Sequence, residues 1–383
     1  MDFDLTEEQV LLKDSISRFV SDNYDLESRR GYTSSDTGFS AENWQQFAEL
    51  GWLSLPFSEE HGGFGGNAVD LMVVMEELGK GLVVEPFLAT VLLFGGALSR
   101  SGNTELQGSL IPSIIDGSLH GALAYHERGS RYALNDVQTT ATSDGDSYVL
   151  DGEKTVVFNA PAANKIIVSA RTSGDRYDDS GISLFIVDAN APGLESTPFK
   201  MMDGQKVCNV KLASVAVTNA DLVGELGAGL TILESVSRSA IVALAAEAQG
   251  AMQVLYESTV EYSKTREQFG VAIGSFQVLQ HRMVDMFAAC EENRSLLYRA
   301  VCSMDEDEAN LNERDIAMNV HALKTMVGRS GKKIGGEAIQ IHGGMGMTDE
   351  LAIGHFFKRL MMINTAFGDA DYHQRKFASL ANA

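Results

Sequence analysis

The C-terminal part of the chain carries its clearest hydrophobic pattern. Apolar residues recur at steps of three and four from Thr231 to Gln268, and similar patterns run over 276–304 and 312–341. This spacing places the apolar side chains on one face of an α-helix. No proline follows Pro198, so nothing in this part obliges a helix to break. The pattern therefore predicts one long helix followed by the antiparallel helices of a bundle.

Between about residues 121 and 224 the pattern changes to short runs rich in β-branched residues. Gly, Asp and Asn separate these runs, as they do in sheets and barrels built from hairpins. We therefore predict an antiparallel sheet or barrel whose strands include 147–150, 155–158, 166–168, 182–187 and 210–217.

Helical signals return in the N-terminal part of the chain. Thr6 and Gln9 have the spacing of a capping box, and Leu5 and Val10 that of a hydrophobic staple. The order along the chain is thus helical, β and helical, which suits a chain of 383 residues. We predict an α+β protein that is mainly α, with an N-terminal helical domain (1–120), a middle antiparallel β-domain (121–225) and a C-terminal four-helix bundle (226–383).

Composition narrows the classes of function. Thirty Lys and Arg against 52 Asp and Glu give a formal charge of −22, which repels phosphate backbones and anionic lipid headgroups. The longest apolar stretch, 81–98, is shorter than a membrane-spanning helix, and residues 1–5 lack the features of a secretory signal. The three cysteines form no Cys-x-x-Cys pair and fit reduced thiols. We expect a cytoplasmic protein with no membrane span and no nucleic-acid partner.

Glycine and histidine spacing predicts neither a dinucleotide fingerprint nor a metal site. The glycine-rich runs at 61–66 and 343–346 do not follow a predicted strand, and no Gly-Lys-Ser follows the first. The eight histidines show no metal-ligand spacing, and no Gly-x-Ser-x-Gly elbow is present. We therefore predict no metal and no serine nucleophile.

One cluster between two predicted helices is more informative. It combines a guanidinium, two amides, two aromatic rings and a glycine, which could together hold the pyrophosphate and a stacked ring of a nucleotide cofactor. A purely structural corner between the two helices is the alternative that composition leaves open. The cluster spans Tyr262 to Gln277, and the groups named here belong to Arg266, Gln268, Phe269, Gly270, Phe276 and Gln277.

Together with motifs elsewhere, this cluster resembles the acyl-CoA dehydrogenase family. The likeness covers nearly the whole chain. Residues 275–282 and 367–371 are most similar to sequences labelled the small subunit of pimeloyl-CoA dehydrogenase. The family motifs are Arg266-x-Gln268-Phe269-Gly270, Phe276-Gln277, Gln340-x-His342-Gly343-Gly344-x-Gly346, Glu59 to Gly63, Asp151 to Thr155 and Gly224 to Gly227.

The resemblance implies the family's three-part fold and its chemistry. Family members bind FAD and oxidise acyl-CoA thioesters to trans-2-enoyl-CoA. A glutamate removes the α-proton, the β-hydrogen leaves as hydride to flavin N5, and an electron-transfer flavoprotein accepts the electrons. An acyl-CoA substrate and a dimer or tetramer are implied as well. By the same resemblance, the adenosine and pyrophosphate end of FAD would be held by Arg266, Gln268, Phe269, Phe276, Gln277, Gln340, His342, Gly343 and Gly344.

The glutamate base of the family has no counterpart at either expected position. Aligning from Gly343 and Gly344 places Phe367 at the usual position, and counting back from the Arg266 motif places Ala240 at the alternative one. Neither side chain can remove a proton. We therefore identify no catalytic residue from the sequence.

Two segments of the predicted β-domain that would contact the flavin ring also differ from the family. The Thr-Glu-Pro-Gly-x-Gly-Ser segment reads His126 to Tyr132 here, and the Trp-x-Thr segment reads Val156 to Phe158. The resemblance therefore implies that this chain lacks the part of the site that would hold its own flavin ring.

In family dimers each flavin lies at a subunit interface, with its ring held mostly by one chain and its adenosine end by the other. The chain thus resembles the base-less member of a heterodimer, and we expect a paralogous catalytic subunit. Two alternatives remain open. One is a self-sufficient flavoenzyme with Asp369, Asp371 or Glu247 as a relocated base, and the other is a non-enzymatic interaction protein that has kept the fold.

Overall fold

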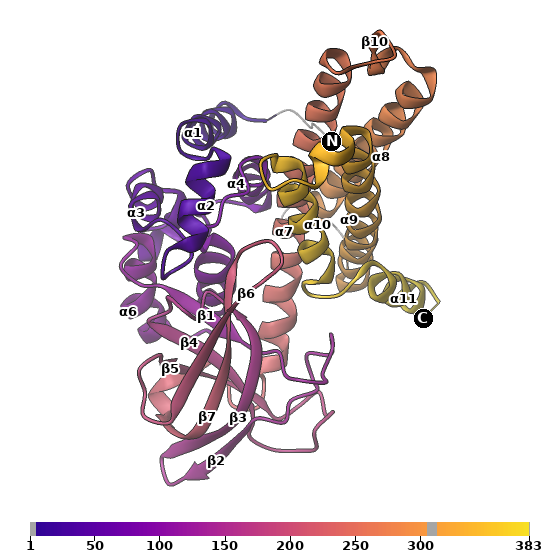
Figure 1. Ribbon diagram of the computed structural model, residues 1–383. Helices are drawn as coiled ribbons and strands as arrows, with labels where there is room; N and C mark the ends of the chain where they lie inside the picture. Colours follow the sequence, from indigo (N-terminus) through magenta and orange to yellow (C-terminus); the bar gives the residue numbers. More distant parts are fainter. Residues whose placement is uncertain (1–4, 305–311, 383) are drawn as a thin grey trace. The chain divides into compact units, whose positions relative to one another are not determined.

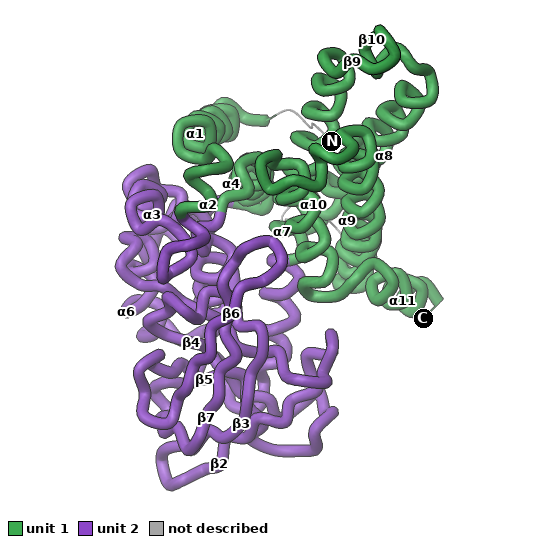
Figure 2. Tube along the Cα trace, in the orientation of Figure 1, with its two compact units in different colours: residues 1–31, 67–83, 241–383 green, residues 32–66, 84–240 purple. Residues whose placement is uncertain are grey.

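A computed structural model describes residues 5–304 and 312–382. Contacts divide the chain into unit 1 (1–31, 67–83 and 241–383) and unit 2 (32–66 and 84–240), shown in Figure 2. Residues 1–4, on which the expected lack of a secretory signal partly rests, lie outside the described residues. The domain boundaries predicted at 120 and 225 stay predictions, because grouping by contact does not test them.

The N-terminal part is helical, as predicted. The capping box is confirmed: Thr6 Oγ1 accepts from the Gln9 backbone N–H at 3.2 Å, and Gln9 Oε1 accepts from the Thr6 N–H at 3.1 Å. The helices are α1 (Glu7–Asn23), α2 (Leu26–Ser34), α3 (Ala41–Glu49), α4 (Ala68–Lys80), α5 (Gly96–Ser99) and α6 (Thr104–Ile115), with 3₁₀ turns η1 (Trp52–Ser54) and η2 (Glu59–His61) and a π-helical segment η3 (Phe87–Gly95).

An eight-stranded sheet follows in unit 2 (Figure 1). Its strand order is β6-β7-β3-β2-β4-β5-β8, with β1 beside β4. Most pairings are antiparallel, as predicted, but β4 pairs in parallel with β1 and, at one position, with β2. The strands are β1 (Gly121–Ala124), β2 (Thr140–Asp144), β3 (Ser147–Phe158), β4 (Lys165–Arg171), β5 (Ile182–Asp188), β6 (Leu194–Lys200), β7 (Lys206–Thr218) and β8 (Leu222–Val223), with a 3₁₀ turn η4 at Asn219–Asp221.

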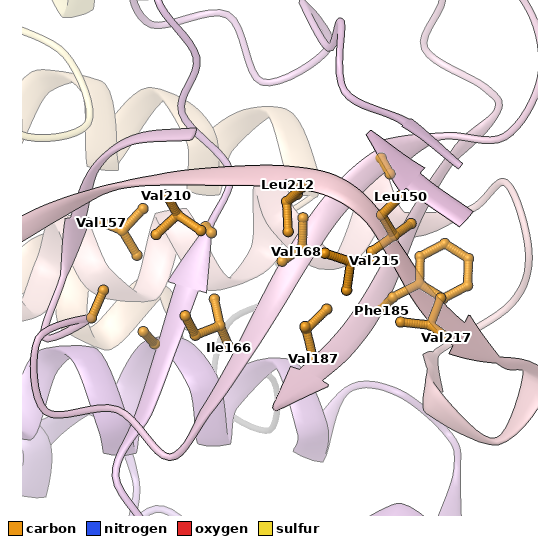
Figure 3. Close-up of a cluster of buried hydrophobic side chains, with 14 of the residues drawn as sticks. Leu150, Val157, Ile166, Val168, Phe185, Val187, Val210, Leu212, Val215 and Val217 are labelled. Carbon is orange, nitrogen blue, oxygen red and sulfur yellow. The ribbon is translucent and has the colours of Figure 1, made fainter. Parts of the chain in front are cut away.

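The predicted strands 147–150 and 155–158 are two ends of the single strand β3. Glycine and aspartate between them suggested a turn, but the chain continues through two register shifts against β7. One side of this sheet packs into an apolar core, in which Leu150, Val168, Phe185 and Val215 lie together (Figure 3). Burying such side chains is worth about 1.5–3 kcal/mol each, so this core holds the strands in register.

The C-terminal part is again helical, which confirms the predicted order of helical, β and helical domains. Within it α9 packs against α8, α10 and α11. The elements are α7 (Gly229–Thr265), β9 (Glu267–Gln268), β10 (Val271–Ala272), η5 (Ile273–Ser275), α8 (Gln277–Met304), α9 (Glu313–His342), η6 (Gly343–Met347), α10 (Ala352–Thr365) and α11 (Ala370–Ala381).

Helix α7 is the only described helix whose length and composition would let it cross a membrane. However, 72% of its most apolar 18-residue window is buried inside the chain, as in the core helix of a globular protein. The helix also ends at Thr265, three residues earlier than its hydrophobic pattern predicts, because Glu267 and Gln268 form the strand β9.

Candidate functional site

A tight β-hairpin joins α7 to α8 and carries the first group of predicted cofactor residues (Figure 1). Gln268 pairs with Val271 in its short ladder. Phe269 and Gly270 form the turn with φ angles of +56° and +81°, and positive φ at both positions is what a type I′ hairpin turn requires. Phe269 is 94% exposed at the tip. An aromatic side chain in this conformation and this exposed is unusual, which marks the hairpin as a candidate contact surface.

The return from the hairpin brings Phe276 and Gln277 beside it. The rings of Phe269 and Phe276 lie edge to face, with centroids 6.3 Å apart. The Phe276 carbonyl accepts the Leu279 backbone N–H at 2.9 Å, so Phe276 precedes the first turn of α8. The two aromatic rings therefore form one small apolar surface, with the exposed Gln277 next to it.

The second group of predicted residues lies where α9 ends. Gln340 is exposed on the last turn, and Gly343 leaves the helix with φ +62°. A Cβ atom added at Gly343 or Gly344 would meet no atom within 4 Å. The backbone here is thus open to close approach by a ligand, which a glycine pair allows. His342 differs from Gln340, Gly343 and Gly344 because it is buried.

Tyr262 and His342 bring these two groups together within unit 1. Their rings are stacked, with centroids 4.3 Å apart and planes inclined by 24°. The site therefore offers a guanidinium from Arg266, carboxamides, aromatic faces and open backbone at one end of the helices, a donor set that fits a pyrophosphate and an adenosine. Sequence reasoning placed Tyr262 in the cluster but gave it no role in the site.

Neither expected base position carries a titratable group. Ala240 is fully buried in α7. Phe367 is partly buried, with φ +57°, in the turn between α10 and α11. This turn is firmly held: the buried Lys324 ammonium donates to the carbonyls of Ile363, Asn364 and Gly368 at 2.6, 2.9 and 2.9 Å. Burial lowers the pKa of Lys324 to about 7, although Asp369 opposes the shift.

The three carboxylates considered as relocated bases have different surroundings. Both oxygens of the buried Glu247 accept from Arg359, at 2.5 and 2.8 Å. Asp369 caps α11 and accepts from the Tyr372 N–H at 2.8 Å. Asp371 is exposed. A general base needs a free lone pair facing the proton that it removes, so the bidentate pairing with Arg359 argues against Glu247.

In unit 2, the segment that replaces the family's Thr-Glu-Pro motif is tied to the sheet. Lys154 Nζ donates to Glu127 Oε1 at 2.7 Å, and both side chains are buried. Burial lowers the pKa of Lys154 to about 8. Burial alone would raise the pKa of Glu127, but attraction to Lys154 holds it below its ordinary value. This ion pair anchors the start of the 126–132 segment.

The side chain of His126 is also bonded within the chain. Its Nε2 lies 2.7 Å from the Arg131 carbonyl and its Nδ1 lies 2.9 Å from Thr155 Oγ1. Close by, Val156 has φ +54° inside the irregular part of β3, an outlier for a β-branched residue. Among the described residues no group of three His, Cys, Asp or Glu side chains could hold a metal ion.

Family comparison agrees with this architecture. The N-terminal, middle and C-terminal domain profiles of acyl-CoA dehydrogenases match residues 6–118, 122–215 and 227–379. The chain therefore belongs to the acyl-CoA dehydrogenase family, a family of flavoprotein oxidoreductases.

Three relatives illustrate the range of the family. The L-prolyl-[peptidyl-carrier protein] dehydrogenase of Serratia sp. (strain ATCC 39006) is 30% identical over 364 residues, which are 92% of this chain and 91% of that one. PigA, solved as an FAD complex, is 27% identical with a TM-score of 0.91 and covers 100% of this chain and 99% of its own. The ChsE4-ChsE5 complex from Mycobacterium tuberculosis is 26% identical with a TM-score of 0.89 over 100% of both chains. FAD, the cofactor predicted from the resemblance, is thus present in a solved relative.

Proposed function

We propose that this chain takes part in the FAD-dependent α,β-desaturation of an acyl-CoA thioester as the subunit without a base in a hetero-oligomer. It holds the adenosine and pyrophosphate end of an FAD whose ring and catalytic glutamate belong to a paralogous subunit. The observation that carries this proposal is the combination of an exposed, assembled donor set at the hairpin with Phe367 and Ala240 at the base positions.

The roles of the residues follow from their chemistry. The Arg266 guanidinium neutralises the pyrophosphate, and the exposed carboxamides of Gln268 and Gln340 donate hydrogen bonds. Phe269 and Phe276 pack on the cofactor, and the open backbone at Gly343 and Gly344 lets it approach. When bound, FAD supplies the hydride acceptor. The residues that would hold it are Arg266, Gln268, Phe269, Phe276, Gln277, Gln340, His342, Gly343 and Gly344.

Exposure supports the idea of a half-site lent to a neighbour. The Phe269 side chain is almost fully exposed on the described chain, and its backbone has a positive φ that costs free energy. Exposed apolar surface in such a place indicates a contact with a partner or ligand. The ChsE4-ChsE5 complex, a relative in which two differently named chains associate, supports the hetero-oligomer in this proposal.

The state of the 126–132 segment supports the other half of the proposal. The His126 side chain is already engaged within the chain, because its two ring nitrogens contact Arg131 and Thr155. Val156 offers no aromatic face in place of the family's tryptophan. We infer that the flavin ring is bound by the partner.

From the resemblance we further propose a kinship with the small subunit of pimeloyl-CoA dehydrogenase, an electron-transfer flavoprotein as acceptor, and a dimer or tetramer. From the three cysteines, which fit reduced thiols, we propose a cytoplasmic location. The competing functions are a self-sufficient dehydrogenase with a relocated base and an interaction protein without enzymatic activity.

Variants of this chain, co-expressed with its paralogous partner, test the proposal. Arg266→Ala and Gln340→Ala should each weaken FAD retention about tenfold or more, since hydrogen bonds to charged groups contribute about 1.5–3 kcal/mol. Arg299→Ala, which removes an exposed cation from α8, is the matched control and should retain FAD. Flavin that is reduced by acyl-CoA in the lone chain would instead establish the self-sufficient enzyme. Absence of flavin from every preparation would favour the interaction protein.

A further inference from the structure

Two segments far apart in the sequence make up the proposed half-site. The first arm is 266–277, comprising the hairpin and the start of α8, and the second is 340–347, the end of α9 and its following turn. A cofactor that touches both arms needs them at a constant separation, because a displacement of even 1 Å weakens a multi-point contact.

Tyr262, just before the first arm, contacts His342 in the second arm. Tyr262 lies one helical turn before Arg266, and His342 immediately precedes Gly343. Their rings stack at 4.3 Å with only 24° between the planes. The Tyr262 hydroxyl also lies 3.5 Å from the His342 carbonyl, a long hydrogen bond that adds little. The contact is thus carried by the ring faces.

Hydrogen bonds to backbone carbonyls join each of the two residues to neighbouring residues of its own segment. The Tyr262 carbonyl accepts the Arg266 N–H at 2.8 Å, at the point where α7 gives way to the hairpin. His342 Nδ1 lies 2.8 Å from the Ala338 carbonyl, which can only accept, so Nδ1 carries the proton. Movement of either ring therefore moves the arm to which it is attached.

The electrostatic state of His342 suits a stacked structural ring. Burial lowers its pKa, although the hydrogen bond to Ala338 opposes the shift. The imidazole is consequently neutral near pH 7. A neutral ring can lie against the Tyr262 phenol without burying an uncompensated charge. Its burial also keeps most of the ring away from any ligand on the outer surface.

We propose that Tyr262 and His342 are positioning residues, a stacked pair that holds the two arms of the half-site at a constant separation, so that His342 supports the cofactor site from beneath. The inference rests on the proposed function for its purpose, but the coupling of the arms is a property of the lone chain. It assigns Tyr262 a role, and it gives His342 a supporting role in place of the cofactor contact that the family motif implies.

A second link, which joins α8 rather than α7 to α9, provides an internal control. Arg282 of α8 pairs with Glu337 of α9 through a partly exposed ion pair. Exposed ion pairs of this kind contribute little to stability. Glu337→Gln therefore breaks a contact between the arms' helices without touching the stack.

Hydrogen exchange of the lone chain, followed by mass spectrometry, tests the coupling. Tyr262→Leu removes the aromatic face while keeping bulk, and we expect exchange to become about 3- to 10-fold faster in both arms, 266–277 and 340–347. Tyr262→Phe keeps the face and should restore the wild-type rates. Glu337→Gln should change them less than twofold. Faster exchange in the first arm alone, or equal effects of Tyr262→Leu and Tyr262→Phe, would overturn the proposal.

Flavin retention in the co-expressed complex separates this inference from the function on which it rests. If the wild-type complex holds FAD, Tyr262→Leu should lose it about 3- to 10-fold faster and Tyr262→Phe should not. FAD lost from both variants at the wild-type rate would refute the positioning role. A complex without FAD, combined with faster exchange in both arms of Tyr262→Leu, would support the coupled pair while refuting the proposed half-site.

Discussion

The buried ion pair between Glu247 and Arg359 allows a sharp test of how unit 1 is held together. Each side chain is 7% exposed, and two hydrogen bonds of 2.5 and 2.8 Å join the carboxylate to the guanidinium. Glu247→Gln keeps the shape of the side chain but removes its charge. The buried guanidinium then has no counter-charge in this contact, and breaking one partner of such a pair costs about 3–5 kcal/mol.

The control and the compensating variant follow from the same reasoning. Glu291 is half-exposed and lies 3.7 Å from Arg294, so Glu291→Gln should cost less than about 1 kcal/mol. The double variant Glu247→Leu/Arg359→Met removes both charges at similar volume. It should recover most of the stability that Glu247→Gln loses, because no buried charge then remains uncompensated.

The assay must report on unit 1. Both tryptophans, Trp44 and Trp52, lie in unit 2, so their fluorescence does not follow the helices that carry the pair. Urea unfolding followed by circular dichroism at the helical band is suitable, with each transition fitted separately if the two units unfold apart. A loss below about 1 kcal/mol for Glu247→Gln, no larger than for Glu291→Gln, would refute the structural role of the pair. It would also return Glu247 to the candidates for a relocated base.

Two further predictions concern Lys324 and the hairpin tip. Because the folded pKa of Lys324, about 7, lies below its ordinary value of 10.5, the unfolded chain binds the extra proton between these values. The free energy of unfolding of the wild type, relative to that of Lys324→Met, should therefore increase as pH rises through this window. Below pH 7 the difference between the two proteins should stay constant. A difference independent of pH over the whole range would contradict the burial of a charged amine. Phe269→Asn places the preferred residue in the type I′ turn, so the free energy of unfolding should rise by up to about 1 kcal/mol. FAD retention in the complex should fall at the same time. Unchanged retention would show that Phe269 does not belong to the cofactor site.

Much of the fold follows from short-range patterns. The helices at 276–304 and 312–341 are found within one or two residues as α8 and α9, since their amphipathic spacing continues to the last turn. The capping box at Thr6 is confirmed because both partners lie three residues apart. Errors arise where the chain departs from a regular period. Helix α7 stops before its apolar pattern does, and β3 runs through a glycine that looked like a turn.

The site was only partly predictable for a related reason. Motifs placed Arg266 and Gly343 in it, but periodicity says nothing about which distant residues meet. The stack of Tyr262 on His342 spans 80 residues and the pairing of Glu247 with Arg359 spans 112. Lys324 gave a weak signal, since it lies on the buried face of α9 beside Leu323 and Val327. Its role required knowing that three carbonyl oxygens converge on it, two from the last turn of α10 and one from Gly368 in the turn that follows.

The ratio of FAD to chains, measured by absorbance on this protein alone and on the complex with its paralogous subunit, tests the central claim most directly. A half-site contributed to a partner predicts little or no flavin in the lone chain and about one flavin for every two chains in the complex, reduced on addition of acyl-CoA. About one flavin per chain in the lone protein would contradict the account, because the chain would then hold a flavin ring of its own.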